Sequence, residues 1–149
     1  MLNRRAWLAA LPALLAAAPA HAFLRPPVKV YKTASCTCCQ GWVRAMFRAG
    51  FYPQVAVVED LTPLNKQHGV PFQLSSCHLS TVGKYVVVGH VPPVDVMLLL
   101  RMRPKGLGLT VPGMPLGSPG METRDGRKEA FASLLLLPGG KTRVFAQHG

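Results

Sequence analysis

Three cysteines crowd into four residues of this chain: Cys36, Cys38 and Cys39. Cys36 and Cys39 have the C-x-x-C spacing that is typical of a redox pair or of a metal site. The cysteines follow an alternating, β-rich segment at 28–32 and precede a segment at 40–49 whose apolar residues share one helical face. Such a junction places sulfurs beside free backbone N–H groups and the positive end of a helix dipole, which favours thiolate over thiol. The pattern therefore predicts thiolates that attack disulfides or bind soft metals.

The fourth cysteine, Cys77, comes about 40 residues later, at the predicted start of a third strand. Three uses of the four sulfurs stay open. Two structural disulfides suit an exported protein, a dithiol oxidoreductase would use Cys36 and Cys39, and a metal site would use all four. A third neighbouring thiol, Cys38, argues against the oxidoreductase because it invites disulfide scrambling.

Among metals, copper fits the cysteine spacing better than zinc. A tetrahedral zinc site usually takes its ligands from two well-separated pairs. Closely spaced thiolates instead suit several Cu(I) ions, because soft sulfur ligands select Cu(I) and one thiolate can bond two ions. The residues therefore predict a thiolate copper site that holds Cu(I), with more than one ion if thiolates bridge.

Methionines extend the supply of soft ligands. Met114 and Met121 lie in a Gly/Pro-rich stretch that begins at Gly106, where a thioether has little core to fill. We predict both as auxiliary copper ligands. Three other methionines fall in helical patterns and are predicted to fill the core: Met46, Met97 and Met102.

The sequence leaves the roles of three histidines open. His78 directly follows Cys77, and adjacent strand residues point to opposite faces, which argues against both binding one ion. His90 fits a turn as well as a ligand. His148, near the end of the sequence, fits either a free side chain or the cap of a site.

The first 22 residues read as a signal peptide. A leader with Arg4-Arg5, an Ala/Leu-rich run at 6–18 and a small-residue triplet at 20–22 follow one another in the usual order. The apolar run is shorter than the roughly 20 residues that a membrane-spanning helix needs, so we expect no stable membrane insertion after cleavage. The sequence predicts export to the periplasm, by the Sec or the Tat route, and one mature domain at 23–149.

Composition narrows the function classes further. The 149 residues include 17 Lys+Arg and 6 Asp+Glu, a formal net charge of +11, and 49% are hydrophobic. A chain so rich in apolar residues can bury a core, which argues against disorder. Its basic residues are scattered, so we expect no nucleic-acid partner.

The mature chain is predicted to be an α/β domain with the element order β-α-β-α-β-β-α, which is that of a thioredoxin-like fold. A Gly/Pro/Met-rich loop and a C-terminal β-hairpin follow this unit. Strands are expected at 28–32, 54–58, 81–82, 85–88, 131–137 and 143–146, and helices at 40–49, 62–68 and 92–102. The strands at 81–82 and 85–88 flank Gly83-Lys84 and are expected to form a hairpin.

Five stretches of the chain resemble the CopG-like family of small exported copper-resistance and metal-binding proteins. These stretches cover nearly all of the mature chain: 30–42 with the Cys-x-Cys-Cys motif, 74–78, 89–92, 111–122 and 144–149. Thr37 departs from the family motif, in which we expect glycine.

The resemblance implies a thioredoxin-like domain with a copper cluster and a role in copper handling or resistance. Its clustered cysteines correspond to Cys36, Cys38, Cys39 and Cys77, and its loop methionines to Met114 and Met121. We expect Cu(I) binding, interconversion of Cu(I) and Cu(II), and copper ions and other periplasmic copper-handling proteins as partners. A thioredoxin-like thiol–disulfide oxidoreductase is the alternative.

Overall fold

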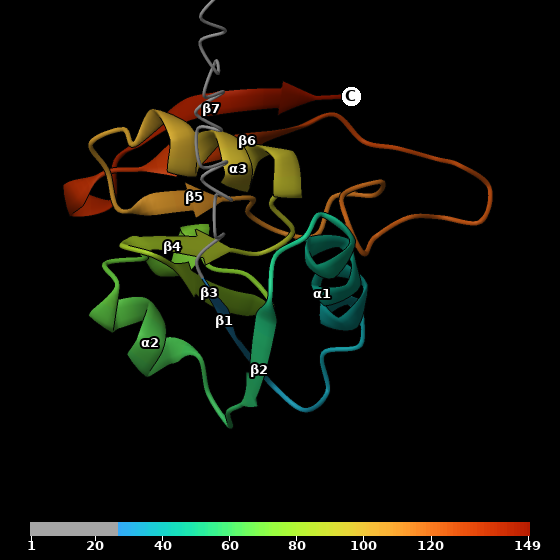
Figure 1. The fold of residues 1–149 in the computed structure, drawn as a ribbon, viewed down its shortest axis with the longest axis horizontal. Helices are drawn as coiled ribbons and strands as arrows, with labels where there is room; N and C mark the ends of the chain where they lie inside the picture. The colour runs from blue at the N-terminus through green and yellow to red at the C-terminus, as the bar shows by residue number, and fades with distance from the viewer. Residues whose placement is uncertain (1–26) are drawn as a thin grey trace, which may run out of the picture.

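A computed structural model describes residues 27–149, so the predicted signal peptide at 1–22 lies outside the described residues. The centre of the fold is a seven-stranded sheet in the order β2-β1-β3-β4-β5-β6-β7 (Figure 1). Pairs β1–β2 and β4–β5 are parallel and the other pairs are antiparallel. The strands are β1 Val28–Lys32, β2 Pro53–Val57, β3 His78–Val82, β4 Tyr85–Val88, β5 Gly108–Thr110, β6 Phe131–Leu136 and β7 Thr142–His148.

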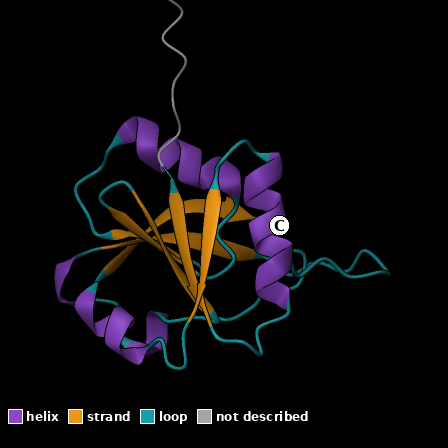
Figure 2. Cartoon of the chain, turned by 60° about the horizontal axis from the view of Figure 1, so that its bottom comes forward, coloured by secondary structure: helices purple, strands orange, loops and turns teal. Residues whose placement is uncertain are grey.

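Helices cover both faces of the sheet (Figure 2). They are α1 Cys38–Arg48, α2 Thr62–Gln67 and α3 Pro93–Met102, with short 3-10 turns at Phe72–Leu74 and Pro138–Gly140. The larger core cluster joins α1 and α3 to one face and includes Trp42, Met46 and Leu99, all fully buried. The smaller cluster, with Leu61 and Val70, covers the other face beside α2. No helix within residues 27–149 combines the length and apolarity needed to span a membrane.

The element order β-α-β-α-β-β-α is confirmed from β1 to α3, as are the mixed α/β class and the C-terminal hairpin of β6 and β7. The start of the first helix differs from the sequence expectation in a way that matters for the cysteines. Helix α1 begins at Cys38 rather than Gln40, so two cysteines lie in its first turn. Thr37 precedes it with a φ of −79°, a conformation open to any residue, so the position does not require glycine.

The Gly/Pro-rich stretch that begins at Gly106 is not a loop throughout, because Gly108–Thr110 forms β5. Three residues between glycines carry too little local signal for a strand. Pairing with β4 on one side and β6 on the other creates it instead.

Two of the three methionines predicted to fill the core do so, and the third is exposed. Met46 is fully buried and Met97 packs against the core, as predicted. Met102 is 62% exposed, so its core assignment is wrong. It is the last residue of α3, where the helical pattern continues but the sheet no longer covers it.

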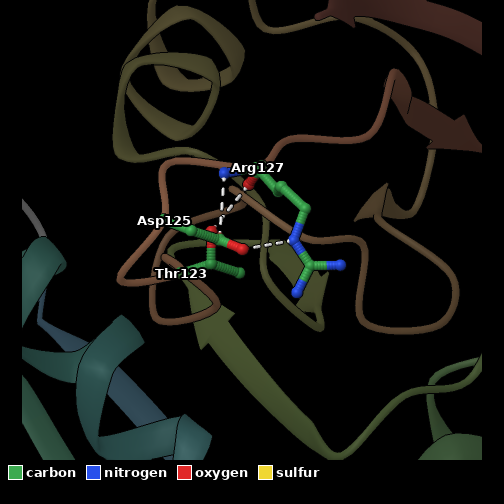
Figure 3. Close-up of polar contacts among 3 residues, drawn as sticks. All are labelled: Thr123, Asp125 and Arg127. Atoms are coloured by element: carbon green, nitrogen blue, oxygen red, sulfur yellow. Dashed lines mark hydrogen bonds and ion pairs between the residues drawn. The ribbon is translucent and has the colours of Figure 1, made fainter.

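A long loop, residues 111–130, joins β5 to β6 and extends past α1 (Figure 1). Its tip is a self-contained turn: Asp125 accepts hydrogen bonds from the Arg127 side chain and backbone, and the Thr123 hydroxyl donates to the Arg127 carbonyl (Figure 3). The Asp125–Arg127 ion pair is mostly exposed, so solvent screening leaves it worth little stability. The tip therefore folds by local contacts alone.

Candidate metal centre

Four cysteine sulfurs gather where β1, α1 and β3 meet, and we call Cys36, Cys38, Cys39 and Cys77 the sulfur cluster. The ligand atoms of all four lie within 4.8 Å of one another. Cys36 and Cys39 are joined in a disulfide, and Cys38 and Cys77 are free thiols. The Cys38 sulfur is 3.7 Å from that of Cys36 and 3.9 Å from that of Cys77. Residues 39 positions apart are thus brought into one site.

The start of α1 sets the electrostatics of the sulfurs that it carries. Cys38 and Cys39 occupy the first helical turn, which contains no acidic residue, and Thr37 gives no side-chain cap. The unpaired backbone N–H groups of this turn and the positive end of the helix dipole favour a negative sulfur. Negative sulfurs at this position could hold a cationic metal.

Cys77 lies in a less polar environment. Burial, followed by the nearby Cys38, raises the pKa of the Cys77 thiol to about 11. At neutral pH the thiol therefore keeps its proton until a cation replaces it.

Two buried histidines flank Cys77. The Nε2 atom of His90 is 3.1 Å from the Cys77 sulfur, and Nδ1 of His78 is 3.5 Å from it. Their ligand atoms form a second group within 4.8 Å, and we call Cys77, His78 and His90 the mixed cluster. The argument against convergence of Cys77 and His78 is wrong, because β3 begins at His78 and Cys77 precedes the strand.

Burial keeps both imidazoles of the mixed cluster neutral. Desolvation lowers the pKa of His78 to about 3, with a further contribution from nearby His90. Desolvation also lowers the pKa of His90. A neutral imidazole is the form that binds a metal ion.

The two loop methionines differ in their surroundings. The sulfur of Met114 is 3.8 Å from that of Cys38, and the residue is 50% exposed. Met121 is half-buried in a turn later in the same loop, where its backbone N–H donates to the carbonyl of Ser118. Within the part of the chain that the structure describes, no hydrogen bond joins the Met121 sulfur to a cysteine. The structure thus brings the Met114 sulfur to the sulfur cluster.

A close backbone contact holds the long loop against α1. A Cβ atom on Gly41 would lie 2.5 Å from the Cα of Gly120, and one on Gly120 would lie 2.6 Å from the backbone nitrogen of Trp42. Gly120 also has a φ of +91°, which side chains disfavour. The Ser76 hydroxyl donates to the Gly113 carbonyl and fixes the loop on the other side. These contacts position Met114.

An open pocket of about 480 Å³ gives solvent access to the sulfurs. Cys36, Cys38, Cys77 and Met114 line it, together with Glu59, Asp60 and five other residues. Two carboxyl groups at the same pocket favour the approach of a cation. Sequence patterns carried no sign of this, because Glu59 and Asp60 are far from every cysteine along the chain.

His148 lies outside both clusters. Its Nε2 atom donates to Asp95 at 2.7 Å, and its ring stacks on Phe131. The Ser133 hydroxyl donates to the same carboxyl oxygen at 2.6 Å. We call Asp95, Ser133 and His148 the carboxylate cluster. It joins α3 to β6 and β7, which gives His148 a structural contact.

Sequence reasoning named every cysteine of the site but missed the convergence of His78 and His90 on Cys77. The signal was present as Cys77-His78 followed by Gly89-His90, at the two ends of a predicted hairpin. Antiparallel pairing of β3 with β4 brings the start of one strand beside the end of the other, so both histidines meet there.

Comparisons with known proteins agree with the fold. A family model described as a protein of unknown function, DUF411, matches residues 74–121, and no curated protein matches the chain. Two solved structures of a copper resistance protein, CopG, in Forms 1 and 2, are each 35% identical to the chain. Form 1 gives a TM-score of 0.77 and covers 83% of this chain and 98% of its own. Form 2 gives 0.78, 84% and 99%. Identity at that level over nearly the whole of the relative shows that the chain belongs to the CopG family.

Proposed function

We propose that the protein binds copper in the periplasm, as Cu(I), and takes part in copper handling and resistance. The observation that carries the proposal is the convergence of four cysteine sulfurs within 4.8 Å at an open pocket. Thiolates at this spacing suit Cu(I), which prefers soft ligands. The similarity to CopG, which is a copper resistance protein, supports the same metal.

The ligands proposed for Cu(I) in the reduced protein, in which the Cys36–Cys39 disulfide is open, are the four sulfurs of the sulfur cluster, with Met114 as an auxiliary donor. Met121 stays a predicted ligand on the strength of its place in the loop. Three cysteines within four residues are better arranged to bridge several ions than to surround one, so the bound copper is proposed to be multinuclear.

The disulfide between Cys36 and Cys39 supports an additional redox role. Two thiolates that lose one electron each form one disulfide, and those two electrons reduce two Cu(II) ions to two Cu(I) ions. Cys38 and Cys77 are free thiols beside the disulfide and stay available as ligands for the reduced ions. Interconversion of Cu(I) and Cu(II) at this site is therefore part of the proposal.

The experiment is metal analysis of the mature protein purified from the periplasm, with and without added copper, and after anaerobic loading in reductant. We expect more than one tightly bound Cu(I) per chain. A reduced, folded protein that stays free of copper under anaerobic loading would refute the proposal. Recovery of the protein only from the cytoplasmic fraction would refute its periplasmic part.

A thiol–disulfide oxidoreductase is the second candidate, and the Cys36–Cys39 disulfide favours it. Such an enzyme needs only this pair, whereas a multinuclear copper site also needs Cys38. A Cys38→Ser variant separates the two: the oxidoreductase keeps its reduction of a disulfide substrate, and the copper protein loses bound ions. Ala45→Ser, on the same helix but outside the cluster, is the matched control.

A further inference from the structure

The two edges of the sheet differ in how they are protected. An edge strand has unpaired backbone N–H and C=O groups, and proteins usually protect such an edge with charged residues, prolines or bulges. At one edge, β7 contains Arg143, and its pairing with β6 is irregular between Ser133 and Leu134. At the other edge, β2 reads Pro-Gln-Val-Ala-Val, with no charged residue, and every residue after Pro53 is exposed. The β2 edge is therefore open to a further strand.

The apolar side chains of β2 lie on the same face of the sheet as α1. Val55 is opposite Val30, which packs in the larger core cluster together with Trp42 of α1. Alternate strand residues share a face, so Val57 lies on this face as well. Val55 is 42% exposed and Val57 is 63% exposed, so α1 leaves both partly uncovered. On α1 itself, Phe47 is 64% exposed. Large apolar side chains gathered at a surface in this way are typical of an interaction site.

A pocket of about 380 Å³ lies where α1 and β2 meet, and the two elements are neighbours in Figure 1. Its lining residues are Val43, Arg44, Phe47, Arg48 and Pro53. Pro53 shares its face with Val55 and Val57, so the pocket opens at the start of the same exposed row. A strand added to β2 would place every second side chain over this face. In such complexes the backbone hydrogen bonds provide affinity, and pockets for alternate side chains provide specificity.

The charges at this pocket are all positive. Arg44 and Arg48 are one helical turn apart on α1, and both line the pocket. Neither takes part in an ion pair within residues 27–149, and that range contains all six Asp and Glu residues of the chain. A carboxylate that pairs with these arginines must therefore come from another molecule. Arginine binds carboxylates through strong, directional hydrogen bonds, so the pocket is complementary to an acidic partner.

A second copy of the chain is a poor source of that carboxylate. Five of the six acidic residues already accept hydrogen bonds within the chain, and these are Asp60, Asp95, Glu122, Asp125 and Glu129. The sixth, Glu59, lines the pocket at the sulfur cluster. A partner with a different, more acidic sequence fits the arginines better than self-association does.

We infer that β2 and the adjoining part of α1 form a docking site for an extended, acidic segment of a partner protein, which adds to the sheet beside β2. The segment places an apolar side chain in the pocket and, two residues away on the same face, a carboxylate against Arg44 and Arg48. The residues that line this pocket are all different from those that line the pocket at the sulfur cluster. The docking site is therefore separate from the proposed copper site, and the inference does not depend on copper binding.

The test titrates a synthetic peptide into the isotope-labelled mature protein and follows the backbone amides by NMR. The peptide, Thr-Asp-Thr-Val-Thr-Glu-Thr with blocked ends, has both carboxylates and the valine on one face of an extended strand. We expect saturable shifts in β2 and in the second half of α1, with β7 unaffected. A peptide with lysine at both acidic positions should bind about tenfold more weakly, because two attractive charge contacts become repulsive. No saturable shifts in β2, or equal binding of the two peptides, would overturn the inference.

A charge reversal in the protein tests the role of the arginines. The double variant Arg44→Glu/Arg48→Glu should prefer the lysine peptide over the acidic one, a reversal that general destabilisation does not produce. The matched control is Lys141→Glu/Arg143→Glu, which makes the same change of charge at the β7 edge and should keep the wild-type preference. Thermal unfolding shows whether both variants are folded. A folded Arg44→Glu/Arg48→Glu variant that still prefers the acidic peptide would refute the assignment of these arginines.

Sedimentation of the protein alone distinguishes an acidic partner from a second copy. We expect a monomer at all concentrations. A dimer that grows with protein concentration and is abolished by Val57→Lys, which places a charge on the β2 edge, would show that β2 pairs with itself and would overturn the acidic partner.

Discussion

The carboxylate cluster and the mixed cluster differ in how their polar atoms are paired. In the carboxylate cluster, one oxygen of Asp95 accepts from both Ser133 and His148, so donors and acceptor match. In the mixed cluster, two imidazoles face a single thiol, and the buried Nε2 atom of His78 has no hydrogen-bond partner among the described residues.

The difference separates a cluster that stabilises the fold from one that lowers its stability. A buried cluster whose donors and acceptors are all paired gains nothing from a cation, and its role is to fasten three elements together. A buried cluster with an unpaired nitrogen bears the cost of the desolvation of that nitrogen. Histidine thus stabilises the fold at one place and carries an unpaired nitrogen at the other.

The largest effect is expected from Cys77→Ser, because the Cys77 sulfur belongs to both the sulfur cluster and the mixed cluster. We expect this variant to lose most of its bound copper, since a hydroxyl is a poor ligand for Cu(I). The midpoint temperature of unfolding of the metal-free variant should lie within a few degrees of that of the metal-free wild type. Metal analysis and thermal unfolding measure the two quantities, and full copper occupancy would contradict the role of Cys77.

A Gly120→Ala variant should disturb copper binding through the loop. The added Cβ would meet the backbone of Trp42 at 2.6 Å, and the φ of +91° disfavours alanine, so we expect a loss of more than about 1 kcal/mol of stability. The copper affinity should fall with it, because the loop carries Met114 and the carbonyl that orients His90. Gly126→Ala is the control: its φ of +72° is similar, but no atom lies within 4 Å. Equal copper affinities in the two variants would contradict this coupling.

An Asp95→Ala variant should lose stability but keep its copper binding, the opposite of what we expect for Cys77→Ser. Removing the carboxylate leaves Ser133 and His148 without their acceptor, which costs about 2 kcal/mol of folding free energy. Copper stoichiometry should stay that of the wild type. Denaturant unfolding and metal analysis provide the readouts, and a loss of copper at unchanged stability would reverse the comparison of the two clusters.

The smallest effect is expected from Met114→Leu. Met114 is half exposed and contributes one thioether, so its loss should weaken Cu(I) affinity several-fold while leaving stability unchanged. Competition with a Cu(I) chelator measures the affinity. Met121→Leu should have less effect, because the Met121 sulfur has no hydrogen bond to a cysteine in the range 27–149. Equal losses in both variants would show that the two methionines contribute equally to copper binding.

Local patterns predicted most of the fold because most of its elements have strong signals in the sequence. The apolar face that contains Trp42 and Met46 predicted α1, and the Gly83-Lys84 turn predicted the β3–β4 hairpin. Strand β5 could not be predicted, since its three residues become a strand only between β4 and β6.

The candidate site was predictable only in part. Cys36, Cys38 and Cys39 are neighbours in sequence, so their spacing shows them to be a cluster. The approach of His90 to Cys77 depends on which residue begins β3 and on the carbonyl of Pro119. Contacts of that kind arise from strand register and loop docking, which no local pattern encodes.

The contact between Gly41 and Gly120 has a consequence for how the protein can vary over evolution. Backbone atoms, not side chains, set the spacing between α1 and the long loop at this point. Surface residues such as Arg44 can therefore change freely without altering the distance between the donors that the helix and the loop contribute. The exposed tip at Thr123–Arg127 is equally free to lengthen, because its hydrogen bonds stay within the turn. Gly41 and Gly120 thus set the distance between α1 and the long loop, while the rest of both segments can change in sequence.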